Sequence, residues 1–123
     1  MFFTQGEEIL MTDNNDITWA QTDDPQACNT NEKDYKLHSR DPVRTPFQWD
    51  DTVQAGFSTN ATWTWLPVNP NYKTKNLKAQ KAATKSTFKL YKDLIKLRDN
   101  HVLTHGGIDT LSMNNNEVFG YLR

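Results

Sequence analysis

Apolar residues recur at intervals of three and four positions between Ser86 and Arg98. Side chains at these spacings lie above one another on a helix, so the pattern predicts a helix with one apolar side. That side should cover about half of the circumference and pack on a core. It comprises Thr87, Phe88, Leu90, Tyr91, Leu94, Ile95 and Leu97.

A second helical segment is expected just before this helix. Asn76 is a suitable N-cap for a helix that begins at Leu77, and the alanines that follow favour helix. The polar run 84–86 interrupts the pattern and predicts a kink between two helical pieces. Ser86 is then the candidate start of the second piece.

The two ends of the chain read as strands. Residues 1–4 are mostly apolar and predict a short buried strand, and residues 13–16 predict a turn after it. Near the other end, residues 108–111 and 118–122 predict two short strands joined by a turn of three asparagines at 114–116.

Polar residues dominate the long stretch between the first strand and the helices. Residues 12–62 are rich in Asp, Asn, Thr and Gln, and residues 17–76 predict one long irregular loop. A lone strand, a lone helix and such a loop cannot cover their apolar faces. We therefore expect a piece of a longer protein, with Met1 an internal methionine. An independent small domain is the alternative, and cooperative unfolding of the isolated chain would support it.

Charge is unevenly distributed although the net charge is only −1. The first 60 residues carry 11 acidic and 4 basic side chains, and the remainder carries 4 acidic and 10 basic ones. Six lysines at spacings of three and four are expected along one side of a helix. No aromatic residues interleave with them and no glycine-rich loop accompanies them, so we predict a solvated helix face and no nucleic-acid partner. The lysines are Lys78, Lys81, Lys85, Lys89, Lys92 and Lys96.

Cysteine content and hydropathy do not determine in which cellular compartment this protein is found. Cys28 is the only cysteine, which excludes a disulfide within this chain. Asn60 begins an Asn-Ala-Thr glycosylation sequon, which matters only in a secreted protein. No apolar run approaches the roughly 18 residues of a membrane span, and no signal peptide precedes Met1.

The segment 39–50, SRDPVRTPFQWD, is the most informative motif. Pro42 and Pro46 exclude a regular helix or a central strand, because proline fixes φ and lacks a backbone donor. The motif therefore predicts a stiff loop that presents Arg44 between two rigid points. A guanidinium held this way can bind a carboxylate through two hydrogen bonds, or donate to hydroxyls. Trp49 adds a flat apolar face on which a sugar can stack.

This motif resembles the signature loop of the α-glucosidase and maltase branch of the α-amylase family, most of all that of insect maltases. The resemblance spans nearly the whole chain in the right order. It includes QGEEI at 5–9, AGFS at 55–58, WLPVNPNY at 65–72 and LYKDLIKLR at 90–98.

The resemblance implies an α/β fold, a part of a (β/α)8 TIM barrel. Residues 1–106 would supply the last strand, the long loop between the eighth strand and the eighth helix, and the last helix. Residues 107–123 would open a C-terminal antiparallel β-domain. Active sites of such barrels lie at the C-terminal face, where this loop rises.

The family hydrolyses glycosides with retention, using an aspartate nucleophile and a glutamate acid/base from earlier strands, and neither motif is present here. We predict no catalytic residue in this chain and no activity of the chain alone. Glu7 and Glu8 are rejected as a catalytic pair, because neighbours on an extended chain point to opposite faces. No cofactor and no metal site is expected, and the partner is a small carbohydrate.

Arg44 is the predicted substrate-binding residue. In resembling maltases the corresponding arginine closes the pocket for the terminal glucose, where it pairs with an aspartate from an early part of the barrel. That ion pair would explain the release of single terminal glucose units. Five neighbours are expected to shape the loop or lie near the substrate, namely Arg40, Asp41, Phe47, Gln48 and Trp49.

The remaining aromatic and histidine residues are not expected to carry chemistry. We expect most aromatic side chains of the loop to pack on one another, with one at the pocket mouth. His38, His101 and His105 lack metal-ligand spacing, and the last two are placed beyond the helix end.

The sequence thus predicts a piece of a retaining α-glucosidase that releases α-1,4-linked glucose from maltose, sucrose or short oligosaccharides. By resemblance the parent protein would be secreted, or anchored outside the cell by a membrane segment. The alternative is a non-catalytic relative, such as the heavy chain of an amino-acid transporter or a membrane-anchored receptor.

Overall fold

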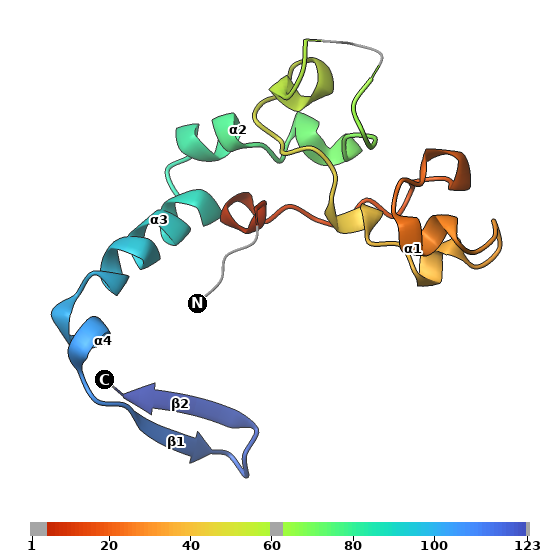
Figure 1. The fold of residues 1–123 in the computed structure, drawn as a ribbon. Coiled ribbons are helices and arrows are strands. Elements are labelled where there is room, and N and C mark those ends of the chain that lie inside the picture. Colours follow the sequence, from red (N-terminus) through yellow and green to blue (C-terminus); the bar gives the residue numbers. More distant parts are fainter. Residues whose placement is uncertain (1–4, 60–62, 123) are drawn as a thin grey trace. The chain divides into compact units, whose positions relative to one another are not determined.

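The computed structural model describes residues 5–59 and 63–122 (Figure 1). The predicted strand at 1–4 and the sequon at Asn60 lie outside the described residues. The chain divides into two compact units, Met1–Lys89 and Leu90–Arg123.

The first unit consists of short helical turns joined by ordered loops (Figure 1). Residues 17–76, the predicted long loop, have local structure throughout their described part, because successive turns and caps order them. The 3-10 helices are η1 Glu7–Ile9, η2 Trp19–Gln21, η3 Tyr35–Leu37, η4 Asp41–Val43, η5 Val53–Gly56 and η6 Pro70–Lys73. The α-helices are α1 Pro25–Cys28 and α2 Leu77–Ala82, with the start of α3 Thr87–Arg98.

A small apolar core joins distant parts of this unit. Ile9, Phe47 and Leu77 are buried together, and Met11 and Phe88 pack against them. These residues come from η1, the proline-rich loop and the starts of α2 and α3. The core therefore holds the loop around Arg44 against the chain's first turn.

The start of α2 is capped by the loop that carries Gln48 and Trp49. The amide of Leu77 donates to the Gln48 carbonyl and that of Lys78 to the Trp49 carbonyl, both at 2.9 Å. The third free amide, of Ala79, donates to the Asn76 side chain at 2.8 Å. The predicted cap at Asn76 is confirmed, and three of the four orphan donors of the first turn are satisfied.

Two asparagines of the WLPVNPNY motif tie the loop together. The Asn69 amide group donates to the Thr12 carbonyl at 3.0 Å, while its oxygen accepts the Asn71 amide at the start of η6. Asn71 in turn donates to the Thr12 hydroxyl at 2.9 Å and accepts from Gln48 at 2.7 Å. Residues far apart in the sequence are thereby fixed side by side.

Gly56 closes a tight turn after the tryptophan of the proline-rich motif. Its φ is +67°, and an added Cβ would lie 2.6 Å from a carboxylate oxygen of Asp50. That carboxylate accepts the amide and the hydroxyl of Thr52. Only glycine fits here, since both the backbone and the space exclude a side chain.

The second unit contains most of α3, then α4 His101–His105, and a hairpin of β1 Asp109–Met113 and β2 Val118–Leu122. The strands are antiparallel, with Leu111 opposite Gly120. The predicted turn at 114–116 is confirmed, and all three asparagines adopt positive φ. The first strand begins one residue later and ends two residues later than predicted.

The predicted helical pieces are confirmed, and so is the break between them. Ser86 immediately precedes α3 and caps it, since its hydroxyl accepts the Lys89 amide at 3.3 Å. The sequence predicted that the six lysines lie along one side of a helix. This is wrong, because they are divided between α2, α3 and the segment between these helices. His101 and His105 lie beyond the end of α3 at Arg98, as predicted. They lie on a further short helix, α4, which Asn100 caps and which the sequence did not predict.

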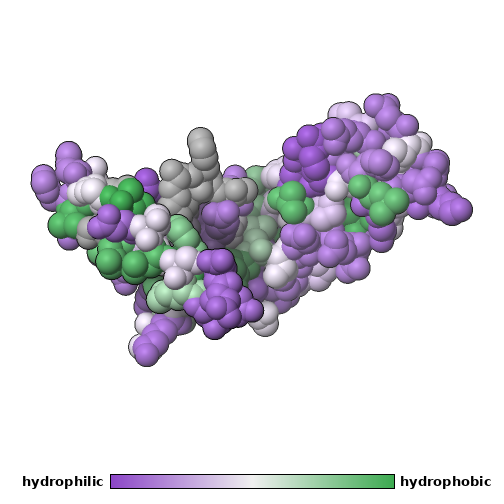
Figure 2. All heavy atoms as spheres, turned by 90° about the horizontal axis from the view of Figure 1, so that it is seen from below, coloured by the Kyte–Doolittle hydropathy of each residue, from purple (hydrophilic) through white to green (hydrophobic). Residues whose placement is uncertain are grey.

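After Phe88, which packs against the core, the apolar side of α3 is not buried within the described residues. No residue of α3 is buried, and Leu90, Leu94, Ile95 and Leu97 are exposed. Figure 2 shows such apolar side chains at the surface beside polar ones. The helix is amphipathic as predicted, but the expected burial of its apolar side is not observed beyond Phe88.

Candidate functional site

Arg44 lines a cavity of about 770 Å³. One wall is the turn that begins at Gly6, and the other is the proline-rich loop. Aromatic rings of Phe47, Phe57 and Trp65 also contribute to its lining. The cavity has the size and the mixture of apolar surface and a few polar groups that small-ligand sites have.

The Arg44 backbone is fixed while its side chain is exposed. Its amide donates to the Asp41 carbonyl at 2.9 Å, and its carbonyl accepts the indole N–H of Trp65 at 2.9 Å. Its guanidinium has no hydrogen-bond or ion-pair partner within 5–59 and 63–122. The loop thus presents five unused donors at the cavity.

Aromatic pairs stiffen the wall of the Arg44 cavity. Phe47 is buried and meets Trp49 edge-on, with 4.7 Å between ring centroids. Phe57 and Trp65 meet in the same way at 4.9 Å. Phe47 therefore packs in the core as well as lining the cavity, whereas Trp49 remains 47% exposed.

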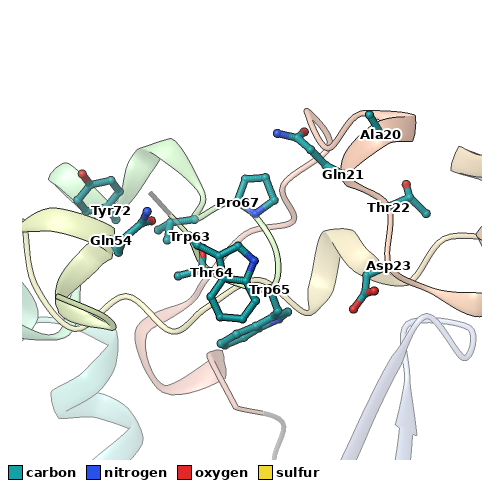
Figure 3. A pocket seen from close by; sticks show the side chains of 11 residues that line it. Ala20, Gln21, Thr22, Asp23, Gln54, Trp63, Thr64, Trp65, Pro67 and Tyr72 are labelled. Carbon is teal, nitrogen blue, oxygen red and sulfur yellow. The ribbon is translucent and has the colours of Figure 1, made fainter. Parts of the chain in front are cut away.

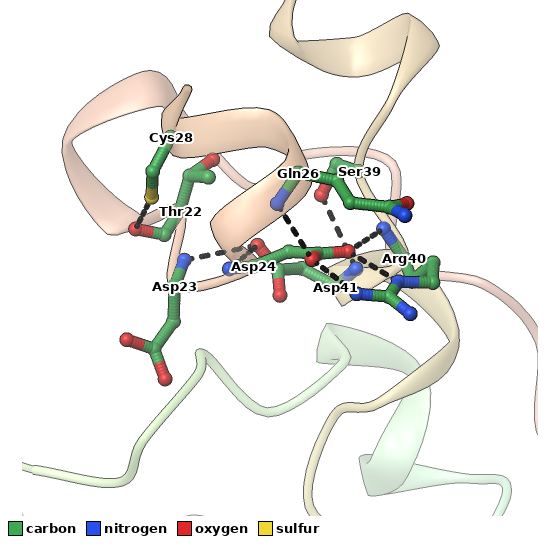
Figure 4. Close-up of polar contacts among 8 residues, drawn as sticks. All are labelled: Thr22, Asp23, Asp24, Gln26, Cys28, Ser39, Arg40 and Asp41. Atoms are coloured by element: carbon green, nitrogen blue, oxygen red, sulfur yellow. Dashed lines mark hydrogen bonds and ion pairs between the residues drawn. The ribbon is translucent and has the colours of Figure 1, made fainter. Parts of the chain in front are cut away.

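Arg40 and Asp41 bind the preceding segment of the chain (Figure 4). The Arg40 guanidinium contacts both carboxylate oxygens of Asp24, at 2.7 and 2.8 Å, and the Arg40 amide donates to the same group at 2.7 Å. Asp41 accepts the amides of Asp23 and Asp24 at 3.0 and 3.1 Å. Asp24 also caps α1 by accepting from Gln26.

The Asp24 carboxylate is ionised at neutral pH although its side chain is fully buried. Hydrogen bonds from the Arg40 side chain hold the pKa of Asp24 well below its usual range, and the backbone amides of Arg40 and Gln26 contribute in the same direction. The same contact raises the pKa of Arg40. Burial opposes both effects and is outweighed, because the pair is bidentate.

Gln48 is fully buried and donates to two groups. Its side-chain nitrogen donates to the Asn71 oxygen and to the Lys75 carbonyl, both at 2.7 Å. Its side-chain oxygen has no partner among the described residues. Gln48 therefore lies behind the cavity wall, and its contacts hold the loop rather than line the cavity.

A second cavity of about 650 Å³ lies beside the first (Figure 3). Gln21 lies on one side of it, Gln54 and Tyr72 lie on the other, and Trp63 and Trp65 lie between them. Trp65 lines both cavities. The sequence analysis treated the aromatic residues of the loop as one group and did not place Trp63, Trp65 and Tyr72 around one space.

Glu7 and Glu8 lie on the 3-10 helix η1, not on an extended chain as predicted. Glu8 accepts the amide of Gly6 at 2.8 Å, whose φ is +103°. Glu7 lines the Arg44 cavity. The reason given for rejecting the pair is therefore wrong, although one of the two carboxylates already has a local partner.

The described residues contain no group of three or more metal-ligating side chains. His101 and His105 stack on each other on α4, with 4.6 Å between ring centroids.

No described helix is long and apolar enough to cross a membrane. The lining of the Arg44 cavity offers hydrogen bonding to hydroxyls or a carboxylate, and stacking on aromatic rings.

Comparison with known proteins identifies the same family that the motif at 39–50 resembles. Residues 1–106 match the family described as "Alpha amylase, catalytic domain". The chain belongs to the α-amylase family. Maltase 1 of Drosophila virilis is 50% identical over 118 residues, and the α-glucosidase of Apis mellifera is 45% identical over the same length.

Solved structures agree with this α-amylase family membership. A variant of the trehalulose synthase MutB, from crystals soaked with trehalulose, superposes with a TM-score of 0.79 at 32% identity, and the match covers 95% of this chain. An isomaltulose synthase variant of Erwinia rhapontici NX5 in complex with sucrose gives a TM-score of 0.76 at 33% identity. The resemblance to insect maltases predicted from the motifs is confirmed.

The chain spans only part of these α-amylase family relatives. Each match includes 96% of this chain, but only 18% of the Drosophila virilis maltase and 20% of the Apis mellifera enzyme. The chain covers 24% of the trehalulose synthase. The fold class is thus that of a partial α-amylase catalytic domain, and the division at residue 106 stays a prediction.

Sequence reasoning missed several residues that hold the site. Asp24, Asn69 and Asn71 were not singled out, yet they make the long-range contacts described above. A local signal existed for two of them, since Asp24 and Asn69 each precede a proline at the start of a helical turn. Nothing local announced their distant partners.

Proposed function

We propose that this chain is the part of an α-glucosidase that closes the pocket for the terminal glucose, with Arg44 as the substrate-binding residue. The observation that supports it most is the exposed Arg44 guanidinium, fixed by its backbone at the edge of an aromatic cavity. Unused donors beside aromatic rings suit a neutral sugar, which offers hydroxyls and apolar C–H faces.

The pocket arginine would select a chain terminus. A carboxylate supplied by another part of the parent protein would pair with Arg44 and close the far end of the cavity. A polysaccharide cannot thread through a closed pocket, so only its non-reducing end enters. The two carboxyl groups that perform retaining hydrolysis would come from elsewhere in the parent, and the chain alone would be inactive.

Within the parent barrel, this chain would supply the end of the last strand, the long loop that follows it and, as α2 and α3, the helix after that loop. This placement puts the Arg44 cavity at the C-terminal face, where barrel enzymes carry their active sites. Arg40 and Asp41 would shape the loop through Asp24, and Trp49 would lie near the entrance.

The relatives also bear on substrate and location. They are named maltases, α-glucosidases and oligo-1,6-glucosidases, which supports a glycoside hydrolase that releases glucose from maltose, sucrose or short oligosaccharides. Two are salivary enzymes of Aedes aegypti and Anopheles gambiae, which supports secretion.

The test replaces Arg44 in the full-length protein. Arg44→Ala is expected to lower kcat/KM for maltose by roughly 10²–10⁴-fold, because a buried carboxylate would lose its partner at a cost of about 3–5 kcal/mol. Arg44→Lys should recover little, since an ammonium cannot reproduce the planar fork.

Lys33→Ala, an exposed change away from both cavities, is the control and should leave kcat/KM unaltered. Undiminished maltose hydrolysis by Arg44→Ala would overturn the role of this residue. A wild-type parent without any glycosidase activity would instead favour the non-catalytic alternative.

A further inference from the structure

The second cavity has no part in the proposed binding of the terminal glucose. It is formed by residues 20–23 on one side and by Gln54, residues 63–65, 67–68 and Tyr72 on the other (Figure 3). Its volume of about 650 Å³ falls within the range of small-ligand sites. All of its residues belong to the first unit, so its walls are placed by one compact body.

Two tryptophans provide flat apolar surface in this cavity. Trp63 and Trp65 leave 67% and 42% of their surfaces exposed. Trp63 makes no hydrogen bond or ring contact within the described residues. Tyr72 is less available, because the Lys73 ammonium lies 4.6 Å from its ring centroid. Exposed aromatic surface gathered in a hollow is typical of a binding site.

Polar groups accompany the rings on the opposite side. Asp23 has an exposed carboxylate, and its backbone is fixed by the bond from its amide to Asp41. Gln21 accepts from Thr18 through its oxygen, which leaves its side-chain nitrogen as a donor toward the cavity. A carboxylate and an amide that line the same cavity as flat aromatic rings complement the hydroxyls and C–H faces of a sugar.

Trp65 connects this cavity to the Arg44 cavity. Its indole lines both, and its N–H bond to the Arg44 carbonyl and its contact with Phe57 hold the ring in place. A ligand that begins at Arg44 can therefore continue past Trp65 toward Trp63. A saccharide chain has the required length and repeats the same chemistry at every unit.

We infer that the cavity around Trp63 binds the distal sugar units of an α-linked glucose oligosaccharide whose terminal unit lies at Arg44. The inference rests on the proposed function for the position of that terminal unit. It predicts that this protein binds substrates longer than a disaccharide more tightly, and that Trp63 and Asp23 carry the difference.

The experiment measures binding to the full-length protein by titration calorimetry. The probes are sulfur-linked maltose and sulfur-linked maltotetraose, which resist hydrolysis. Trp63→Ala is expected to weaken binding of the tetraose about tenfold, the effect of losing one stacked ring. Its affinity for sulfur-linked maltose should be unchanged. Asp23→Asn should act in the same direction and less strongly.

Leu37→Ala provides the matched control, since Leu37 is an exposed apolar side chain outside both cavities. Equal affinity of wild type and Trp63→Ala for the tetraose overturns the inference. A loss on both probes together with a lower midpoint of thermal unfolding also overturns it, because Trp63 would then pack inside the parent protein. Since no turnover is measured, failure of the Arg44 hypothesis in its activity assay is a separate result.

Discussion

Single residues in this chain act mainly by fixing other residues. Arg40, which stands four positions before Arg44, directs its guanidinium back to Asp24 rather than into a cavity. The side chain of Asp24 is fully buried while that of Arg40 is 46% exposed. One arginine of the motif therefore serves the loop, and the other is left free at the cavity.

The Asp24 contact predicts a pH dependence of stability. Arg40→Ala should lower the midpoint of thermal unfolding of the full-length protein at pH 7, because a buried carboxylate loses its partner. The pKa of Asp24 is lowered in the folded state, so the contact stabilises the fold above the unfolded pKa near 4 and the stabilisation is lost as pH falls further. The difference between wild type and variant should therefore shrink below about pH 4.

Thermal unfolding measured by circular dichroism from pH 3 to pH 8 checks this. Arg40→Lys, which keeps the charge without the two-pronged geometry, should fall between wild type and alanine. A wild-type advantage that stays constant over the whole range would contradict the assignment.

At the scale of elements, short helices depend on contacts from outside themselves. α2 has six residues, too few to be stable alone in water. Its first turn is satisfied by two carbonyls of the proline-rich loop and by Asn76. The loop that presents Arg44 and the helix that follows it therefore stabilise each other.

Asn76→Ala is expected to destabilise the folded state by about 1–2 kcal/mol, the typical cost of losing an N-cap. Asn76 is buried and also donates to the Tyr72 carbonyl at 2.8 Å, so the upper part of this range is expected. Urea unfolding of the full-length protein measures the change.

The matched control is Asn100→Ala, which removes the exposed cap of α4. It should cost less, because water can replace the lost acceptor there. Equal costs at the two positions would show that the coupling between loop and helix is absent.

At the scale of the whole molecule, the two units differ in how much apolar surface they cover. The first unit buries a small core, whereas α3 and the hairpin expose Leu94, Ile95, Phe119 and Tyr121. The curated relatives that the chain matches are about five times longer. Apolar faces of this kind are usually covered by another layer of structure.

The 123-residue chain by itself is therefore expected to unfold without a single cooperative transition and to bind a hydrophobic dye such as ANS. Its maltose hydrolysis should be undetectable. Calorimetry checks the first point, since a two-state unit gives equal calorimetric and van't Hoff enthalpies. Such equality, with one sharp transition, would support the independent domain that the sequence left as an alternative.

Local chemistry was enough to predict several elements. The spacing of apolar residues determined α3, Asn76 and Ser86 determined where helices begin, and three asparagines determined the hairpin turn. The motif around Arg44 determined the family. These features depend on residues within a few positions of one another, which is the range over which caps, turns and helical periodicity operate.

Tertiary structure alone decided which distant groups meet. The pairing of Asp24 with Arg40, the binding of Thr12 by Asn69 and the cavity between Gln21 and Trp63 join residues 16 or more positions apart. Nothing in local propensity selects one such partner among many, because the choice depends on the path of the whole chain. Arg44 is left exposed for the same reason, since its place at the cavity follows from how the loop is folded back.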